Sequence, residues 1–225
     1  MATEEHTDLQ AVAVAIPRAA AKKQDLSDIW SRLIRHQLEV AHTFATDQSE
    51  YMVLREKIQD PPPLSGRNLA IFETVFVGVG RKVVSYDVGL ASSSLAQVLK
   101  SALRDMGLNC SPARAPSLLV KLAHAARSPA SQLELKTGQF ALTTNRYLVV
   151  SDDLECPLLK QLAPAQRAVM RLLIYGSSHA DIAARRHTSS RTVANQVASA
   201  CQRLGVSGRF DLLQRVATAR RPMNY

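Results

Sequence analysis

Side chains that can hydrogen-bond to nucleic-acid bases recur at helical spacing between residues 190 and 204 of this chain. The segment reads SRTVANQVASACQRL, and it opens on a cluster of serine, arginine and threonine. Asparagine and glutamine amides pair with adenine through two hydrogen bonds, and an arginine guanidinium pairs with guanine in the same way. Each such pair discriminates against a wrong base by about 1–3 kcal/mol. A helix with these residues on one face could therefore read double-stranded DNA in the major groove.

The apolar residues of the same segment indicate which face is exposed. Val193 and Val197 are about one helical turn apart and, with Leu204, would anchor the helix to a core. We expect the remaining face to contact bases through Arg191, Ala194, Asn195, Gln196 and Ala198. The two small alanines would let the helix approach base edges or thymine methyl groups closely.

Cations and hydroxyl groups flank this face and suit the DNA backbone. We expect phosphate contacts from Arg185, Ser190, Thr192, Ser199, Arg203 and Arg209. Contacts of this kind supply affinity that falls as salt is added, and they carry little sequence information.

Two shorter amphipathic segments precede the base-reading segment, and capping residues mark where the helices begin and end. Pro164 suits the first turn of a helix, and Gly176 suits a left-handed helix end. Ser178 and Ser189 can each accept a hydrogen bond from a backbone N–H at the start of the helix that follows. Gly205 would end the last helix. Three helices with tight breaks are typical of a helix-turn-helix, which we expect over residues 162–213.

Positive charge is concentrated at the same end of the chain. The net charge is +9; residues 162–225 hold ten basic and two acidic side chains, whereas residues 1–63 have a net charge of −3. A polyanionic partner explains this asymmetry better than solubility does. The three cysteines are widely spaced, which fits a reducing compartment, and no apolar run reaches the length of a membrane span. We therefore expect a cytoplasmic, nucleoid-associated protein that binds double-stranded DNA and contacts no membrane.

The chain uses one plan twice. Shifted by 98 positions, Leu64–Leu108 aligns with Leu162–Val206 without a gap, with eight identical residues and with apolar residues matched at helical spacing. Upstream of each copy, two alternating runs flank a polar turn, TDQS or TTN, which predicts a β-hairpin. An amphipathic helix, Leu26–His36 or Ser117–Arg127, precedes each hairpin. We also expect Ser117–Arg127 to close the first unit and Arg209–Ala219 to close the second.

The predicted fold class is mainly α, with two tandem helix-turn-helix units, each preceded by a helix and a small β-hairpin. We expect a flexible N-terminal tail over residues 1–24, a first, degenerate unit over residues 25–127 and a second, DNA-binding unit over residues 128–225. The acidic start of the tail and its short apolar core argue against a signal peptide.

The first unit has lost part of the DNA-binding set. Ser93 stands where the second copy has Arg191, and Asp105 stands where it has Arg203. An acidic residue at a phosphate-facing position repels DNA. The cations and the amide that remain are Lys82, Gln97, Lys100 and Arg104. The first unit is therefore either a weak DNA-binding unit or a packing and dimerisation module.

Residues 162–213 resemble the LuxR/GerE-type helix-turn-helix domain of bacterial transcription regulators. The matching residues are Leu162, Pro164, Arg167, Val169, Leu172, Leu173, Gly176, Ser178, Ile182, Ala183, Arg185, Ser189, Thr192, Val193, Asn195, Leu204, Gly205, Val206 and Arg209. The resemblance implies that Ser190–Leu204 enters the major groove and that base contacts come from the positions of Ala194, Asn195 and Ala198.

Two departures from this family change the expected contacts. Ala163 stands where a capping threonine is usual, which would cost about 0.5–2 kcal/mol of helix-end stability. Two positions that are often long and basic are the small Ala194 and Ala198. The base contacts that we favour therefore shift to Arg191, Asn195 and Gln196, the remaining side chains that can hydrogen-bond to bases.

Other functions receive less support from the sequence. A sigma-like promoter-recognition factor needs an upstream helical domain rich in aromatic and basic residues, whereas the upstream part here is acidic and carries hairpin patterns. A protein-interaction or dimerisation module with the same fold also stays open. Asp152, Asp153 and Glu155 suggest an exposed acidic loop, and we expect no enzyme activity, no metal site and no cofactor. RNA polymerase, a second copy of the chain and an intramolecular pseudo-dimer are the candidate protein partnerships.

Overall fold

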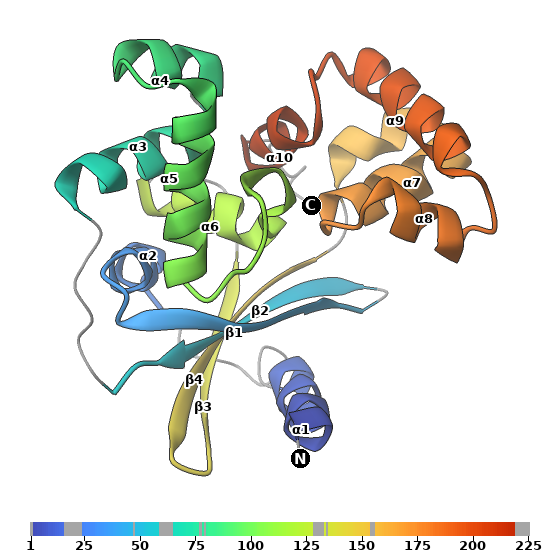
Figure 1. Ribbon diagram of the computed structural model, residues 1–225. Coiled ribbons are helices and arrows are strands. Elements are labelled where there is room, and N and C mark those ends of the chain that lie inside the picture. Colours follow the sequence, from blue (N-terminus) through green and yellow to red (C-terminus); the bar gives the residue numbers. More distant parts are fainter. Residues whose placement is uncertain are drawn as a thin grey trace, which may run out of the picture.

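A four-stranded antiparallel sheet lies beneath most of the helices in the computed structural model of the chain (Figure 1). The strands are β1 (Leu38–Ala45), β2 (Ser49–Glu56), β3 (Lys136–Leu142) and β4 (Asn145–Asp153), in the order β1-β2-β4-β3. The structure describes residues 2–15, 24–46, 48–58, 65–76, 78, 80–127, 133, 135–153 and 156–218. Within these residues, no helix has the length and apolar character needed to cross a membrane.

The two predicted hairpins are present, and they join into one sheet. β1 pairs with β2 and β3 pairs with β4, as the polar turns predict. β2 also pairs with β4, in a register that sets Met52 opposite Val150 and Leu54 opposite Leu148. This pairing satisfies backbone groups that an isolated hairpin would leave at an open edge. The expectation of one separate hairpin per unit is corrected to a single sheet shared by both halves of the chain.

Both faces of the sheet are covered. The side chains that face the main core include Met52, Leu54, Leu148 and Val150, and those on the other face include Tyr51, Val53, Tyr147 and Val149. Helix α1 (Ala2–Ala15) lies against this second face, with Leu9 and Ala13 buried (Figure 1). The sequence predicts a flexible tail over residues 1–24, and the structure instead forms a helix over residues 2–15. The second face of the sheet is apolar, and burying Leu9 and Ala13 against it removes apolar surface from water, which stabilises the helix.

Helices fill the other side of the sheet in two successive sets. The first set is α2 (Leu26–Ile34), α3 (Gly66–Phe76), α4 (Arg81–Asp87), α5 (Ser92–Asp105) and α6 (Ser117–Arg127). The second set is α7 (Pro164–Ile174), α8 (His179–Arg185), α9 (Ser190–Leu204) and α10 (Arg209–Thr218). Short 3₁₀ turns, Pro112–Arg114 and Pro157–Gln161, precede α6 and α7. The helices predicted at residues 26–36, 117–127 and 209–219 are confirmed to within two residues at each end.

Helices α3, α4 and α5, which we call the first triplet, correspond one by one to α7, α8 and α9, the second triplet. Their paired start residues, each pair 98 positions apart, are Gly66 and Pro164, Arg81 and His179, and Ser92 and Ser190. Within each triplet, all three helices contact one another. The two triplets stand side by side on the same side of the sheet (Figure 1). The shift of 98 positions found in the sequence thus matches the spacing of the helices.

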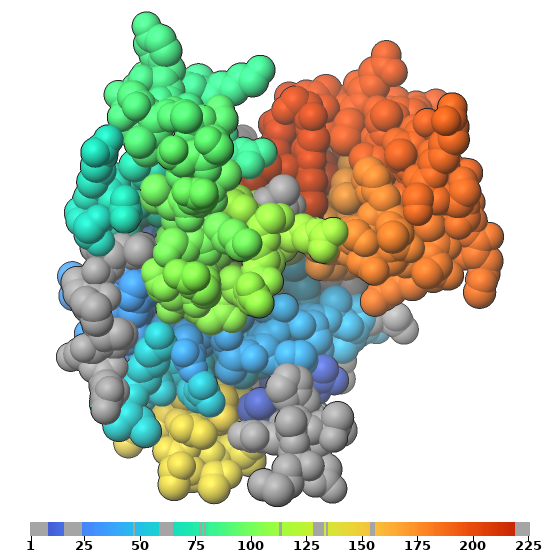
Figure 2. Space-filling model, in the orientation of Figure 1, coloured from blue at the N-terminus to red at the C-terminus, as the bar shows by residue number. Residues whose placement is uncertain are grey.

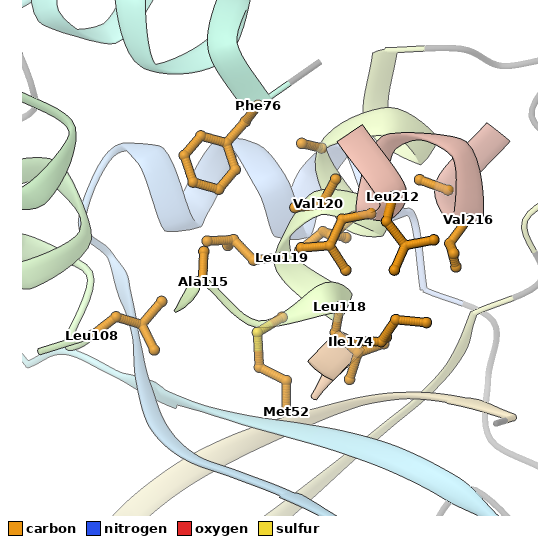
Figure 3. Close-up of a cluster of buried hydrophobic side chains, with 14 of the residues drawn as sticks. Met52, Phe76, Leu108, Ala115, Leu118, Leu119, Val120, Ile174, Leu212 and Val216 are labelled. Carbon is orange, nitrogen blue, oxygen red and sulfur yellow. The ribbon is translucent and has the colours of Figure 1, made fainter. Parts of the chain in front are cut away.

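One hydrophobic core connects the two triplets. Figure 3 shows side chains of β2 (Met52), α3 (Phe76), α6 (Leu119), α7 (Ile174) and α10 (Leu212) gathered in one cluster. α6 contacts α2, α3 and α10 as well as both central strands of the sheet. Three short helices alone would leave much apolar surface in water, so both triplets pack onto these shared elements. The two units expected on either side of residues 127 and 128 therefore share one hydrophobic core.

A buried ion cluster joins α6 to the two central strands. Lys121 Nζ lies 2.6 Å from Glu50 Oε1 on β2 and 2.5 Å from Asp152 Oδ2 on β4. Ser117 donates a hydrogen bond to the other carboxylate oxygen of Glu50. The three charged side chains are only 3–7% exposed. Asp152 is therefore a buried partner of Lys121, which corrects its assignment to an exposed acidic loop.

Candidate nucleic-acid interface

Side-chain caps fix the starts of α8 and α9. Ser178 Oγ accepts a hydrogen bond from the Asp181 N–H at 3.1 Å, and the Asp181 carboxylate accepts one from the Ser178 N–H at 2.9 Å. The Ser178 hydroxyl also donates to the Asp181 carboxylate at 2.6 Å, and this bond, with the one from the Ser178 N–H, lowers the pKa of Asp181. Ser189 Oγ accepts from the Thr192 N–H at 3.0 Å. Gly205 ends α9 in the left-handed conformation, with φ of 63°. The predicted caps at Ser178, Ser189 and Gly205 are confirmed.

Helix α9 is anchored along one side and open along the other. The anchoring residues are Val193, Ala200, Cys201 and Leu204, which are buried, and Val197, which is half-buried. Arg191, Asn195 and Ala198 are exposed, and Ala194 is half-buried. Figure 2 shows the orange-red atoms of this helix at the surface of the second triplet. The open side offers a guanidinium, an amide and two small residues, a combination suited to base edges in a major groove.

Two residues expected to contact DNA lie at the edge of this open side. Gln196 is half-buried, and its Oε1 is enclosed by protein atoms. Ser199 is half-buried and accepts a hydrogen bond from Gln166 Nε2 of α7 at 3.1 Å. With about 3.6 residues per turn, residues 196 and 199 fall on a flank of α9. The base contact expected from Gln196 and the phosphate contact expected from Ser199 are therefore not favoured by this geometry.

The margins of α9 retain four of the residues expected to contact phosphates. These are Arg185, Ser190, Thr192 and Arg203, all of which are exposed. No described carboxylate forms a salt bridge with Arg185, Arg191 or Arg203. Guanidinium groups that lack a protein counter-ion are available for charge-assisted hydrogen bonds to phosphate oxygens.

Arg209 is placed inside the protein, where it holds backbone carbonyls. Its Nε donates to the Leu173 carbonyl at 2.5 Å, and its Nη2 donates to the carbonyls of Ile174 and Ala115, both at 2.8 Å. Burial lowers the pKa of this guanidinium to about 10, so it remains charged at neutral pH. The expected phosphate contact of Arg209 is corrected to a structural role: it caps the end of α7 and ties α7 to the segment before α6.

Two further residues of α10 hold the ends of other helices. Arg215 donates to the carbonyls of Leu204 and Gly205 at the end of α9, at 3.1 and 2.8 Å. Gln214 donates to the Phe76 carbonyl at the end of α3 at 3.0 Å. Gln214 and Phe76 are 138 positions apart in the chain, so the sequence alone does not indicate this contact. Through these bonds, α10 holds the C-terminal ends of α9 and α3.

Within the described part of the chain, no three histidine, cysteine, aspartate or glutamate side chains gather closely enough to hold a metal ion. The exposed side chains of α9 can hydrogen-bond to bases and form ion pairs with phosphates.

Comparison with protein families matches residues 158–204 to the model of sigma-70, region 4. This is a helix-turn-helix, DNA-binding family, and the matched residues run from the turn before α7 to the end of α9. No curated protein sequence and no solved structure matches the chain. The helix-turn-helix predicted from the sequence is supported, and so is DNA binding. The matched model is that of a sigma-factor domain, whereas the acidic upstream part of the chain with its hairpins argues against a sigma-like factor.

Proposed function

We propose that this chain is a sequence-specific, DNA-binding transcription regulator of the LuxR/GerE type that inserts α9 into the major groove. The main support is the open side of α9, where Arg191 and Asn195 are exposed on a helix with a capped N-terminus. The match to a helix-turn-helix family and the net charge of +8 over residues 162–225 support the same function. A basic surface of this kind attracts the phosphate backbone and brings the helix to the groove.

The contacts divide into two kinds. Asn195 and Arg191 read bases, with Ala194 and Ala198 allowing close approach of the helix. The residues that bind the backbone are Arg185, Ser190, Thr192 and Arg203. Base contacts set which sequence is bound, whereas phosphate contacts strengthen binding to every sequence alike.

The first triplet is, in this proposal, a degenerate copy of the helix-turn-helix that packs against the rest of the protein. α4 exposes Val83 and Tyr86, which are 54% and 89% accessible, at the positions where α8 has Asp181 and Ala184. The exposed Val83 offers no hydrogen bond to a phosphate, and Asp105 stands where the second triplet has Arg203. The two triplets then form an intramolecular pseudo-dimer in which only the second reads DNA.

The family match favours a second candidate, a promoter-recognition factor that acts with RNA polymerase. The two candidates differ in whether the chain alone directs core RNA polymerase to a promoter. Transcription in a purified system with core polymerase and no other sigma factor separates them. Promoter-specific transcripts under these conditions would favour the sigma-like function over the regulator.

The main proposal is tested by selecting bound fragments from a random duplex library with the full-length protein. We expect a defined sequence motif, and an affinity for that motif that falls as salt is added. The full-length variant Arg191→Ala/Asn195→Ala, which leaves the shared core unchanged, is the control and should select no motif. An affinity that is indifferent to salt, or a library that yields no motif, would show that the chain is an interaction module instead.

A further inference from the structure

A cleft of about 880 Å³ opens where the second triplet meets the rest of the molecule. Its walls include the end of β1, the segment around residues 110–118 and helices α7 and α8. None of the five residues expected to contact bases is among its described lining residues. The cleft is therefore separate from the open side of α9.

Positive charge dominates the cleft. Arg114, Arg171 and Arg185 come from three different elements, and none of them forms a salt bridge with a described carboxylate. Among the described lining residues, Glu50 is the one carboxylate, and it is already bound by Lys121 and Ser117. The charge of the arginines therefore has no complement within the cleft, and an anion is the fitting occupant.

The rest of the wall is mixed and includes an apolar patch. This patch includes Pro116, just before α6, and Leu118 in the first turn of α6, together with Leu172 and Tyr175 at the end of α7. Burial raises the pKa of the Tyr175 hydroxyl, so this group stays protonated and can donate a hydrogen bond. Beside the arginines, this wall can hold an aromatic ring or a short hydrocarbon chain.

We propose that the cleft binds a small organic anion that carries an apolar ring. Its carboxylate or phosphate is held by Arg114 and Arg171, and its ring packs against Leu118, Leu172 and Tyr175. The site goes beyond the proposed function, because it requires no DNA for its formation or its occupation. Arg185 is left out of the test, since the proposed function also assigns it to phosphate contacts.

A probe pair that differs only in charge tests the site. Calorimetric titration of the full-length protein without DNA would compare naphthalene-2-carboxylate with naphthalene-2-carboxamide, its uncharged amide. We expect the carboxylate to bind at least about tenfold more tightly, because the arginines form charge-assisted hydrogen bonds with it alone. The double variant Arg114→Ala/Arg171→Ala should lose this preference. The matched control Arg146→Ala, an exposed arginine of β4 outside the cleft, should keep it.

The Arg114→Lys/Arg171→Lys variant guards against a merely structural effect. It keeps both charges, so it should retain most of the preference for the carboxylate. Both replaced arginines are exposed, and thermal unfolding of each variant shows whether it is folded. Equal affinity for the two probes, a preference that survives in the double alanine variant, or no saturable binding of either probe would overturn the proposal.

Discussion

The two triplets share their helix boundaries and differ in what their surfaces and helix ends do. α5 exposes Ser93 and Gln97 where α9 exposes Arg191 and Asn195, and Asp105 takes the place of Arg203. The buried positions of both triplets remain apolar. Because packing depends on the buried side alone, the outward side of a helix is free to change while the arrangement of helices is kept.

The helix ends separate the triplets further. Ser178 and Ser189 cap α8 and α9, whereas Gly80 and Ala91, which precede α4 and α5, provide no side-chain cap. The first triplet is held by aromatic packing instead: Phe72 stacks with Trp30 and Phe76, and Phe76 contacts Phe210 edge-on. Side-chain caps therefore hold the starts of α8 and α9 in the second triplet. In the first triplet, stacked aromatic rings in the core take the place of these caps.

The largest expected effect concerns the glycines that end α5 and α9. Both have positive φ, 86° at Gly107 and 63° at Gly205. A Cβ at Gly107 would lie 2.7 Å from the Val40 carbonyl oxygen, whereas at Gly205 the nearest atom lies at 3.7 Å, in the flexible side chain of Arg215. Gly107→Ala should lower the free energy of unfolding by about 2–5 kcal/mol, and Gly205→Ala by about 1–2 kcal/mol. Equilibrium urea unfolding measures both, and equal losses would show that the backbone at Gly107 does not lie against Val40 of β1.

The next effect separates the two arginines that the sequence assigns to phosphates. Arg209→Ala leaves three buried carbonyls without their donor and should lower the free energy of unfolding by about 1.5–3 kcal/mol. Arg203→Ala should change stability by less than about 0.5 kcal/mol. It should instead weaken binding to all duplexes alike and flatten the salt dependence. Stability and duplex affinity measured on both variants test this division, and a stable Arg209→Ala protein with weakened DNA binding would reverse it.

A matched pair of amides tests which triplet reads sequence. Asn195→Ala should weaken binding to the selected motif by about 1–3 kcal/mol and relax specificity at one base position. Gln97→Ala, at the matching position of α5, should leave affinity and specificity unchanged. Fluorescence anisotropy with the motif and with single-base variants of it gives both quantities. A loss of specificity on Gln97→Ala would mean that the first triplet reads DNA as well.

The smallest effect concerns the first helix of each triplet. Here the first triplet has the side-chain cap and the second triplet lacks one. Ser65 Oγ accepts from the Asn68 N–H at 3.4 Å before α3, whereas Ala163 precedes α7 without a side-chain cap. Ala163→Ser should stabilise the protein by about 0.5–2 kcal/mol, and Ser65→Ala should destabilise it by a similar amount or less. Thermal unfolding of the two variants measures the change. A loss of stability on Ala163→Ser would contradict the role of this position as a helix cap.

Local patterns in the sequence predict most of the elements. Apolar periodicity, polar turns and the serine and glycine caps place α7–α9 and both hairpins, because these signals act over a few residues. The pairing of β2 with β4 is not predicted, since the alternation in each strand is compatible with either an open edge or a neighbour. The same limit explains Arg209 and Gln196: whether a polar side chain faces solvent or a distant carbonyl depends on elements far away in the chain.

The central claim, that the outward side of α9 is what distinguishes the second triplet, is tested most directly by giving α9 the residues of α5. The variant Arg191→Ser/Asn195→Gln/Arg203→Asp replaces three outward side chains and leaves the buried ones unchanged. Its affinity for the selected duplex is measured by fluorescence anisotropy at low ionic strength, beside the unaltered protein. We predict that specific binding is abolished while the unfolding midpoint stays near that of the unaltered protein. An affinity equal to that of the unaltered protein would contradict the claim.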